Sequence, residues 1–379
     1  MSDATIGRLQ AIFPELSPEH HPVLGVTATG NPAGNSVGGQ VPSVISVPIE
    51  IDPRIERMVR LAILSAPAVI LVGPPGSGKT TLLRQVVDRI VADPKSFGFQ
   101  AGPTGVEWSA AEENWSATDL VGGQTIDGAE LRFRPGRVLS AVAAGRWLII
   151  DEVNRADMDR IFGGLLTWLS GQDVTLGAVS PSIGSPQVEL GWSGTARCSV
   201  ENAALLTTPE TGAGPVRYLA GTEWRLLGTY NALDAQRVFR FGHALGRRFL
   251  RVPIPAADVE RFRIALLGQD SGLPEPLLDA IVAIYAAHLA NSMTTLGPAL
   301  FLRMADYIAA GVGTDAEPLT GVSQVDRELL AEAYLVNVGT WLREMEDELP
   351  SLGRAIVEEH HALGQSEWEW IVEMSRVLS

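Results

Sequence analysis

The stretch "AVILVGPPGSGKTT" (residues 68–81) decides how the rest of the chain is interpreted. Five apolar residues run into a loop with three glycines, and the helical pattern "TTLLRQVVDRIVADP" begins at the end of that loop. The loop fits G-x-x-x-x-G-K-[ST] and lies between a predicted strand and a predicted helix, the context in which this pattern marks a phosphate-binding loop. We therefore predict a nucleotide phosphate site here. The alternative is a glycine turn with a chance lysine, and the flanking elements count against it.

The chemistry of this loop suits a triphosphate. Glycines allow backbone N–H groups to curl around phosphate oxygens, and the N-terminus of the following helix adds partial positive charge. We expect Lys79 to reach the β- and γ-phosphates and Thr80 to place its hydroxyl on Mg²⁺. The predicted nucleotide-binding residues are Gly73, Pro74, Pro75, Gly76, Ser77, Gly78, Lys79, Thr80 and Thr81.

A second signal is "WLIIDEVNRAD" (residues 147–157), in which an apolar run ends in two adjacent carboxylates. Ligands of open α/β sheets bind at the carboxyl ends of the strands, so this strand would project Asp151 toward the phosphate site. A phosphate loop needs an acidic group from a neighbouring strand to hold Mg²⁺, and we assign that role to Asp151, acting mostly through water. Glu152 is assigned as the general base for the attacking water. The alternative is that both carboxylates only cap the next predicted helix, "DMDRIFGGLLTWL".

Strand and helix patterns alternate through the first two thirds of the chain. Further strands are predicted in "GVEWSA", "EWRLLGTYN" and "RFLRVPIP", and this alternation indicates a parallel α/β sheet sandwiched by helices. Residues 1–45 are predicted to be a flexible N-terminal arm, and residues 46–255 the nucleotide-binding domain. Residues 178–222 are rich in Gly, Ser and Pro and are interpreted as an insertion with hairpins. Residues 256–379 show helical spacing without strand signals, which predicts an all-helical lid and C-terminal region.

Composition excludes some classes of protein. Cys198 is the one cysteine, so no intramolecular disulfide can form, which fits a reducing cytosol. The chain starts without a basic region followed by an apolar run, and no apolar run approaches the roughly 18 residues that cross a membrane. We therefore expect a cytoplasmic protein with no membrane segment. The formal net charge of −15 argues against a surface that is basic throughout and binds nucleic acid, but it leaves room for a local basic patch.

Taken together, these motifs resemble the AAA+ ATPases, in the branch that contains McrB, MoxR and the dynein-like modules. The resemblance covers about residues 60–255. "GPPGSGKTT" resembles the Walker A motif of this branch, and "LIIDEVNRAD" resembles its Walker B motif with the "NRA" extension. "NRADMDRIFGGLL", "LLGTYNALD" and "ALGRRF" are most similar to McrB-like patterns, from which Tyr230 and "ALD" depart. The 178–222 insertion has no counterpart that we can place.

The resemblance implies roles for residues outside the two motifs. Asn231 is similar to sensor 1, a polar side chain that orients the attacking water against the γ-phosphate. Arg247 and Arg248 resemble arginine fingers, which reach the active site of a neighbouring subunit, and the pattern leaves open which of the two does so. The alternative is that both are solvated residues before a strand. Asp234 matches an acid that could contact a stimulating partner, and a surface turn is the alternative.

Three further residues have two interpretations each. For Asn154 and Arg155 the resemblance implies a coupling role at the subunit interface or toward the sensor. From the residues alone, Asn154 is a helix N-cap with Asp157 at the third helical position. Sensor 2 of this branch is often Ser-Pro-Arg, whereas "LGPALFLR" has Ala299 where the arginine would stand. Arg303, about one turn later, could replace it as a nucleotide contact or could be an exposed helix arginine.

Three other stretches are weaker signals. "LRFRPGR" (131–137) carries three arginines in a predicted hairpin insert, which in this branch can face a pore or substrate, with a solvated loop as the alternative. "EEHH" (358–361) is interpreted as a solvated face rather than a metal site. "SEWEWIVEM" (366–374) is interpreted as core or partner packing, because base stacking favours basic neighbours.

The resemblance implies a homo-oligomer, usually a hexameric ring, that hydrolyses ATP or GTP with Mg²⁺ to remodel or translocate a macromolecule. Two versions remain open. The chain is either the motor subunit of a McrBC-like defence system with a McrC-like nuclease partner, or a MoxR-like chaperone with a von Willebrand factor A-type partner. "IFGGLL" and "NALD" favour the first version; the charge and the lack of a recognisable DNA-reading domain in the arm weaken it, and nucleic acid stays an open substrate. A nucleotide-dependent scaffold with little hydrolysis is the rival from another class.

Overall fold

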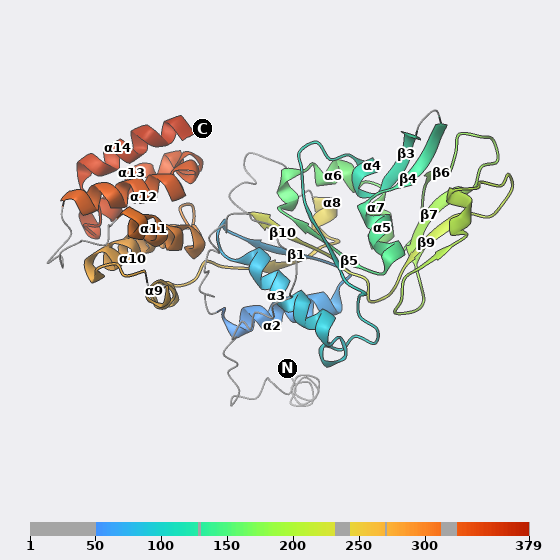
Figure 1. The fold of residues 1–379 in the computed structure, drawn as a ribbon, viewed down its shortest axis with the longest axis horizontal. Helices are drawn as coiled ribbons and strands as arrows, with labels where there is room; N and C mark the ends of the chain where they lie inside the picture. Colours follow the sequence, from blue (N-terminus) through green and yellow to red (C-terminus); the bar gives the residue numbers. More distant parts are fainter. Residues whose placement is uncertain (1–50, 128–129, 232–242, 270, 312–323, 379) are drawn as a thin grey trace, which may run out of the picture.

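The computed structural model describes residues 51–127, 130–231, 243–269, 271–311 and 324–378 (Figure 1). An α/β part comes first and an all-helical part follows it. The predicted arm over residues 1–45 lies outside these ranges, and so does Asp234. None of the helices in the described ranges is long and apolar enough to cross a membrane.

Five parallel strands form the central sheet, in the order β11-β1-β10-β5-β2. Their bounds are Ala68–Gly73 (β1), Val106–Ala110 (β2), Trp147–Asp151 (β5), Leu226–Asn231 (β10) and Leu250–Pro253 (β11). The apolar runs of β1 and β5 are buried, as expected for strands that are covered on both faces. The predicted parallel α/β fold is therefore confirmed. Because β10 lies between β1 and β5, its last residue stands between the phosphate loop and Asp151.

Helices cover this sheet on both faces. In Figure 1, α2 (Pro53–Ser65) and α3 (Lys79–Ala92) run below the sheet, and α6 (Met158–Ile161) and α8 (His243–Gly246) lie above it. The remaining helices of this part are α4 (Ala117–Leu120), α5 (Arg137–Ala144) and α7 (Leu165–Leu169). Helix α2 begins at a clear sequence signal. The side chain of Asp52 accepts a hydrogen bond from the backbone N–H of Arg54, and Pro53 occupies the first helical position.

A buried arginine ties α2 to the sheet. Arg225, just before β10, donates to the carbonyl oxygens of Ile63 (2.5 Å) and Leu64 (3.0 Å) in the last turn of α2, and to two carbonyls near its own position. Burial lowers the pKa of Arg225 to about 10. The carbonyls of a helix C-terminus need partners, and here a single guanidinium supplies them from the sheet.

The segment before β10 forms a sheet of its own. Its strands are Val174–Ala178 (β6), Gln187–Trp192 (β7), Ser199–Glu201 (β8) and Val216–Ala220 (β9), in the order β6-β7-β9-β8. The prediction was hairpins over 178–222, whereas this sheet already begins at Val174 and its two central strands, β7 and β9, are parallel. Trp168 of α7 stacks on Trp192 at 4.8 Å, and the indole N–H of Trp192 donates to the carbonyl of Trp168. Strands β3 (Gly122–Asp127) and β4 (Glu130–Pro135) make a separate hairpin.

The helical part has a second hydrophobic core. Its helices are Val259–Gly268 (α9), Glu275–Leu289 (α10), Pro298–Gly311 (α11), Gln324–Leu342 (α12), Leu349–Arg354 (α13) and Gln365–Ser375 (α14). A polar bridge crosses this core, because one ring nitrogen of His288 contacts the Thr294 carbonyl and the other contacts the Tyr334 hydroxyl, each at 2.7 Å. Burial lowers the pKa of His288 to about 4. The neutral ring therefore fixes the turn after α10 against α12.

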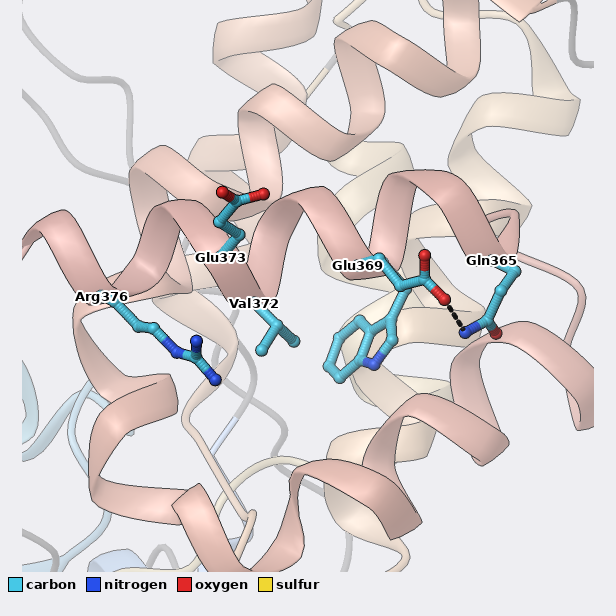
Figure 2. A pocket seen from close by; sticks show the side chains of 6 residues that line it. Gln365, Glu369, Val372, Glu373 and Arg376 are labelled. Atoms are coloured by element: carbon cyan, nitrogen blue, oxygen red, sulfur yellow. Dashed lines mark hydrogen bonds between the residues drawn. The ribbon is translucent and has the colours of Figure 1, made fainter.

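A hollow at α14 is lined by Trp368, Val372 and four polar residues (Figure 2). Trp368 is mostly buried, whereas Trp370 on the same helix is 39% exposed, so "SEWEWIVEM" contributes one indole to the core and one to the surface. Among the described residues there is no group of three or more His, Cys, Asp and Glu side chains that could hold a metal ion.

Candidate nucleotide site

The phosphate loop lies between β1 and α3, as predicted. Gly78 is the N-cap of α3 with φ +83°, and Gly76 has φ +75°, so both adopt left-handed conformations that favour glycine. Lys79 is the first residue of α3 and is only 5% exposed. Its ammonium folds back over the loop and donates to the carbonyl oxygens of Gly73 (3.1 Å) and Pro74 (2.7 Å).

The loop has the features that a phosphate group requires. No side chain caps the N-terminus of α3, so the first N–H groups of this 14-residue helix have no side-chain acceptor. The hydroxyl of Ser77 is buried and has no hydrogen-bond partner. A Cβ added at Gly78 would meet nothing within 4 Å, so open space lies beside the N-cap. Uncapped donors, an orphaned hydroxyl and a lysine beside them fit an anion.

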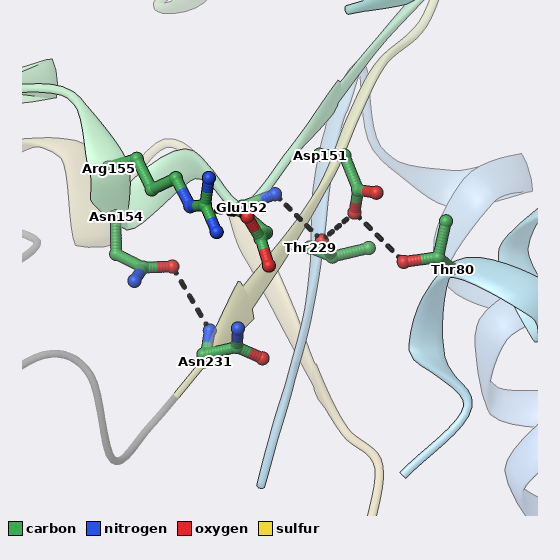
Figure 3. Close-up of polar contacts among 7 residues, drawn as sticks. All are labelled: Thr80, Asp151, Glu152, Asn154, Arg155, Thr229 and Asn231. Atoms are coloured by element: carbon green, nitrogen blue, oxygen red, sulfur yellow. Dashed lines mark hydrogen bonds and ion pairs between the residues drawn. The ribbon is translucent and has the colours of Figure 1, made fainter. Parts of the chain in front are cut away.

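Asp151 lies at the carboxyl end of β5 and faces the phosphate loop. Its Oδ1 accepts a hydrogen bond from the Thr80 hydroxyl at 2.9 Å and another from the hydroxyl of Thr229 on β10 (Figure 3). Thr80 and Asp151 were predicted to meet at one Mg²⁺ ion. A hydroxyl and a carboxylate are oxygen donors of the kind that Mg²⁺ prefers, so this pair fits the ion.

Thr229 is a residue that the sequence analysis missed. It is 1% exposed, and besides bonding Asp151 its hydroxyl accepts the backbone N–H of Glu152 at 3.0 Å. One buried hydroxyl therefore fixes both acidic positions relative to β10. The only signal in the sequence is a threonine inside the apolar strand "LLGTYN", and a β-branched residue there needs no functional reason.

Glu152 follows β5 in a left-handed conformation with φ +51°. This conformation is uncommon outside glycine and turns the chain sharply into η3, the 3-10 turn Val153–Arg155. The carboxylate of Glu152 pairs with the guanidinium of Arg155, with 2.5 Å between Oε2 and Nε. The sequence left the contact of Arg155 open, and the structure places it on the candidate base.

Asn154 connects the same turn to the candidate sensor. It is 1% exposed, and its Oδ1 accepts the backbone N–H of Asn231 at 3.1 Å (Figure 3). The interpretation of Asn154 as a helix N-cap was wrong. Asp157 has that role, because its carboxylate accepts the N–H of Arg160 at the start of α6. Asn154 instead lies inside η3 and holds the end of β10.

Arg247 and Arg248 lie between α8 and β11, and their environments differ. The guanidinium of Arg248 donates to the Ser170 hydroxyl at the end of α7 at 3.1 Å, and its backbone N–H bonds Leu245. Arg247 is exposed.

The helical part contacts the phosphate loop directly through its backbone. Gly297 donates its N–H to the carbonyl of Pro75 at 2.8 Å, and Ala299 donates to the carbonyl of Gly76 at 3.2 Å. A Cβ at Gly297 would lie 2.0 Å from the carbonyl carbon of Gly76, so only glycine fits there. Arg303, the predicted substitute for sensor 2, lies one turn further along α11 with an exposed side chain. The contacts to the loop in this segment are therefore made by the first turn of α11 and the residue before it.

The three arginines of "LRFRPGR" divide between two elements. Arg132 and Arg134 belong to β4 of the hairpin, and Arg132 pairs with Glu130 at 2.5 Å. Arg137 begins α5 instead, which corrects the prediction that all three lie in a hairpin. It donates to the Ser109 hydroxyl on β2 at 2.9 Å and lies over the Trp115 ring.

Comparison with known proteins agrees with this geometry. Residues 68–249 match the family model of the AAA domain (dynein-related subfamily). The match runs from β1 to the residue before β11 and includes the added sheet. The fold of this segment, with the phosphate loop and Asp151 at the carboxyl ends of two parallel strands that flank β10, is the AAA fold.

Two solved structures show a more distant similarity. One is NtrX from Brucella abortus in complex with ADP, at 12% identity, covering 85% of this chain and 68% of that chain with a TM-score of 0.38. The other is NtrX from Brucella abortus in complex with ATP, at 12% identity, covering 89% of this chain and 69% of that chain with a TM-score of 0.37. The assignment of the fold rests on the strand order and on the match to residues 68–249, not on these two structures.

Proposed function

We propose that this protein is an Mg²⁺-dependent nucleoside triphosphatase of the AAA+ type, with ATP as its nucleotide. The observation that carries the proposal is the convergence of side chains from three adjacent strands: Lys79 and Thr80 after β1, Asp151 and Glu152 at the end of β5, and Asn231 at the end of β10. A phosphate grip, an oxygen pair for a divalent cation and a carboxylate beside an amide are the groups that phosphoryl transfer to water requires. ATP is the default nucleotide. GTP stays open, because the loop binds the phosphates rather than the base.

The residues would act on the bound nucleotide as follows. Lys79 would exchange its two carbonyl partners for phosphate oxygens, and Thr80 and Asp151 would hold Mg²⁺, which would neutralise charge on the phosphates. The oxygen of a water molecule forms a bond to the γ-phosphorus as the bond to the bridging oxygen of ADP breaks. Glu152 accepts the proton from that water, and the Asn231 side chain orients it. The products are ADP and inorganic phosphate.

The direct test is the rate of phosphate release from ATP by the wild type and by Glu152→Gln. The amide keeps the shape of the side chain but cannot accept the proton, so the turnover number should fall by about 10² to 10⁴ while ATP still binds. Lys79→Ala should weaken ATP binding itself. If the wild type releases phosphate no faster than Glu152→Gln with either ATP or GTP, the chain is a nucleotide-dependent scaffold and the proposal fails.

We also propose that the chain assembles into a ring, in which Arg247 of one copy completes the site of the next. The difference between the two arginines supports this choice, because Arg248 is anchored on Ser170 within its own chain whereas Arg247 is exposed. An arginine supplied in trans stabilises charge in the transition state of phosphoryl transfer. Arg247 is therefore the better candidate for a finger that acts on a neighbour.

For the work that hydrolysis drives, we propose remodelling of a protein, as in MoxR-like chaperones, beside the McrBC-like motor that the sequence motifs favour. The supporting observation concerns exposed apolar side chains outside the nucleotide site. Ile126 in the β3–β4 hairpin is 79% exposed, and Ile183 between β6 and β7 is 98% exposed. Exposed apolar side chains suit contact with a protein, whereas Arg132 and Arg134 on the same hairpin would suit a nucleic-acid backbone and keep the McrBC-like motor as the second version. Stimulation of ATP hydrolysis by a protein rather than by DNA would support this version.

A further inference from the structure

Four polar side chains of the nucleotide site already have partners in this structure. Lys79 contacts two carbonyls of the loop, Thr80 contacts Asp151, and Glu152 contacts Arg155. If the function proposed above holds, a bound nucleotide with Mg²⁺ offers new partners for the first two pairs. Lys79 would then contact phosphate oxygens in place of the two carbonyls, and Thr80 and Asp151 would hold the cation in place of their direct bond.

The pair between Glu152 and Arg155 is different, because its geometry is set by η3. Glu152 is the N-cap of η3 and Arg155 is its last residue, and the backbone N–H of Arg155 donates to the carbonyl of Glu152 at 2.9 Å. Figure 3 shows Arg155 on the far side of Glu152 from Thr80, which marks the position of the cation and phosphates. A nucleotide bound on the Thr80 side therefore does not displace the Arg155 guanidinium from Glu152.

We propose that Arg155 is a brake on Glu152. This inference rests on the proposed function and adds a control to it. The ion pair holds Oε2 of the carboxylate on the guanidinium and so withholds that oxygen from the attacking water. Hydrolysis is faster when the pair is open, so Arg155 acts through Glu152 and is a positioning residue rather than a catalytic one.

The exposure of the pair sets the strength of this brake. The Arg155 side chain is 60% exposed and that of Glu152 is 33% exposed, so water competes for both groups. Opening such a pair should raise the turnover number for ATP about fivefold. This corresponds to about 1 kcal/mol, at 1.36 kcal/mol per tenfold change in rate. A brake of this size slows turnover without abolishing it.

The test is the steady-state rate of ATP hydrolysis with Mg²⁺ by the full chain, for the wild type and Arg155→Ala at the same concentration, chosen so that the wild type is assembled. We expect the turnover number of Arg155→Ala to rise about fivefold with KM within twofold of the wild type. Arg155→Lys should stay within twofold of the wild type, because an ammonium can keep the pair. Arg160→Ala, which removes an exposed guanidinium from neighbouring α6, is the matched control and should change nothing.

Two further measurements make the outcome specific. In the Glu152→Gln background, Arg155→Ala should no longer raise the rate, because the group that it restrains is gone. Sedimentation of each variant at the assay concentration shows whether a change in self-association explains the change in rate. Arg155→Gln takes the place of Arg155→Ala if the alanine variant does not fold.

The inference is overturned if Arg155→Ala, at matched association, turns over at or below the wild-type rate, or if its effect persists with Glu152→Gln. That result would leave the proposed function intact. A wild type that is no faster than Glu152→Gln would instead overturn the proposed function and this inference with it.

Discussion

At the scale of single residues, Thr229 illustrates what motifs leave out. The loop residues, Asp151 and Glu152 could be predicted because each belongs to a pattern whose chemistry depends on residue type and spacing. The role of Thr229 depends on the strand order, which places β10 beside β5 and points its hydroxyl at Asp151. Asn154 was assigned to the wrong partner for a similar reason. Its contact with Asn231 spans 77 positions of sequence, whereas a cap is a local pattern.

Replacement of Thr229 by valine should slow ATP hydrolysis without changing the shape of the site. Valine fills the same volume but removes the bond to Asp151 and leaves the N–H of Glu152 without its acceptor, which costs about 1–3 kcal/mol. We expect the turnover number for ATP to fall about tenfold. Thr229→Ser retains the hydroxyl and should stay close to the wild type in the same assay. Equal turnover by the valine variant would show that the hydroxyl does not position the two acids.

At the scale of elements, the main addition to the sequence analysis is the contact between the helical part and the phosphate loop. The helical spacing of "PALFLRMADYIAAG" predicted α11 correctly, over Pro298–Gly311. Nothing in that spacing indicates that the turn before α11 bonds the loop, because this contact depends on the backbone of Gly297 rather than on a side chain. His288 holds the same turn from the other side through Thr294. The turn is thus fixed at both ends, on the loop and on the helical core.

Gly297→Ala should therefore weaken nucleotide binding, although Gly297 lies outside the two nucleotide motifs. The new methyl group would overlap the backbone of Gly76 and Ser77, at 2.0 and 2.1 Å, and relief of such overlap costs about 1–3 kcal/mol. We expect the dissociation constant for ATP, measured by calorimetry, to rise about tenfold. Gly194→Ala is the matched control, because a Cβ there meets nothing within 4 Å. Unchanged affinity in Gly297→Ala would mean that the loop tolerates displacement of the turn.

At the scale of the whole molecule, the sequence predicted an α/β part followed by a helical part, because strand alternation and helical spacing are repeated over many residues. It did not predict the four-stranded sheet, since the parallel pairing of β7 with β9 joins segments whose turns resemble ordinary hairpins. The whole-molecule proposal is a ring in which each site uses an arginine from the next copy. The exposure of Arg247 beside the anchored Arg248 makes this proposal specific to one residue.

The measurement that tests the account most directly mixes two inactive variants. Lys79→Ala cannot hold nucleotide but keeps Arg247, and Arg247→Ala keeps its site but lacks the finger for its neighbour. Each alone should release phosphate from ATP at a small fraction of the wild-type rate. Once sedimentation shows that the two chains assemble together, a mixture should recover a clear part of the wild-type rate, highest at intermediate ratios. No recovery at any ratio in such mixed assemblies would contradict a nucleotide site that a second copy completes.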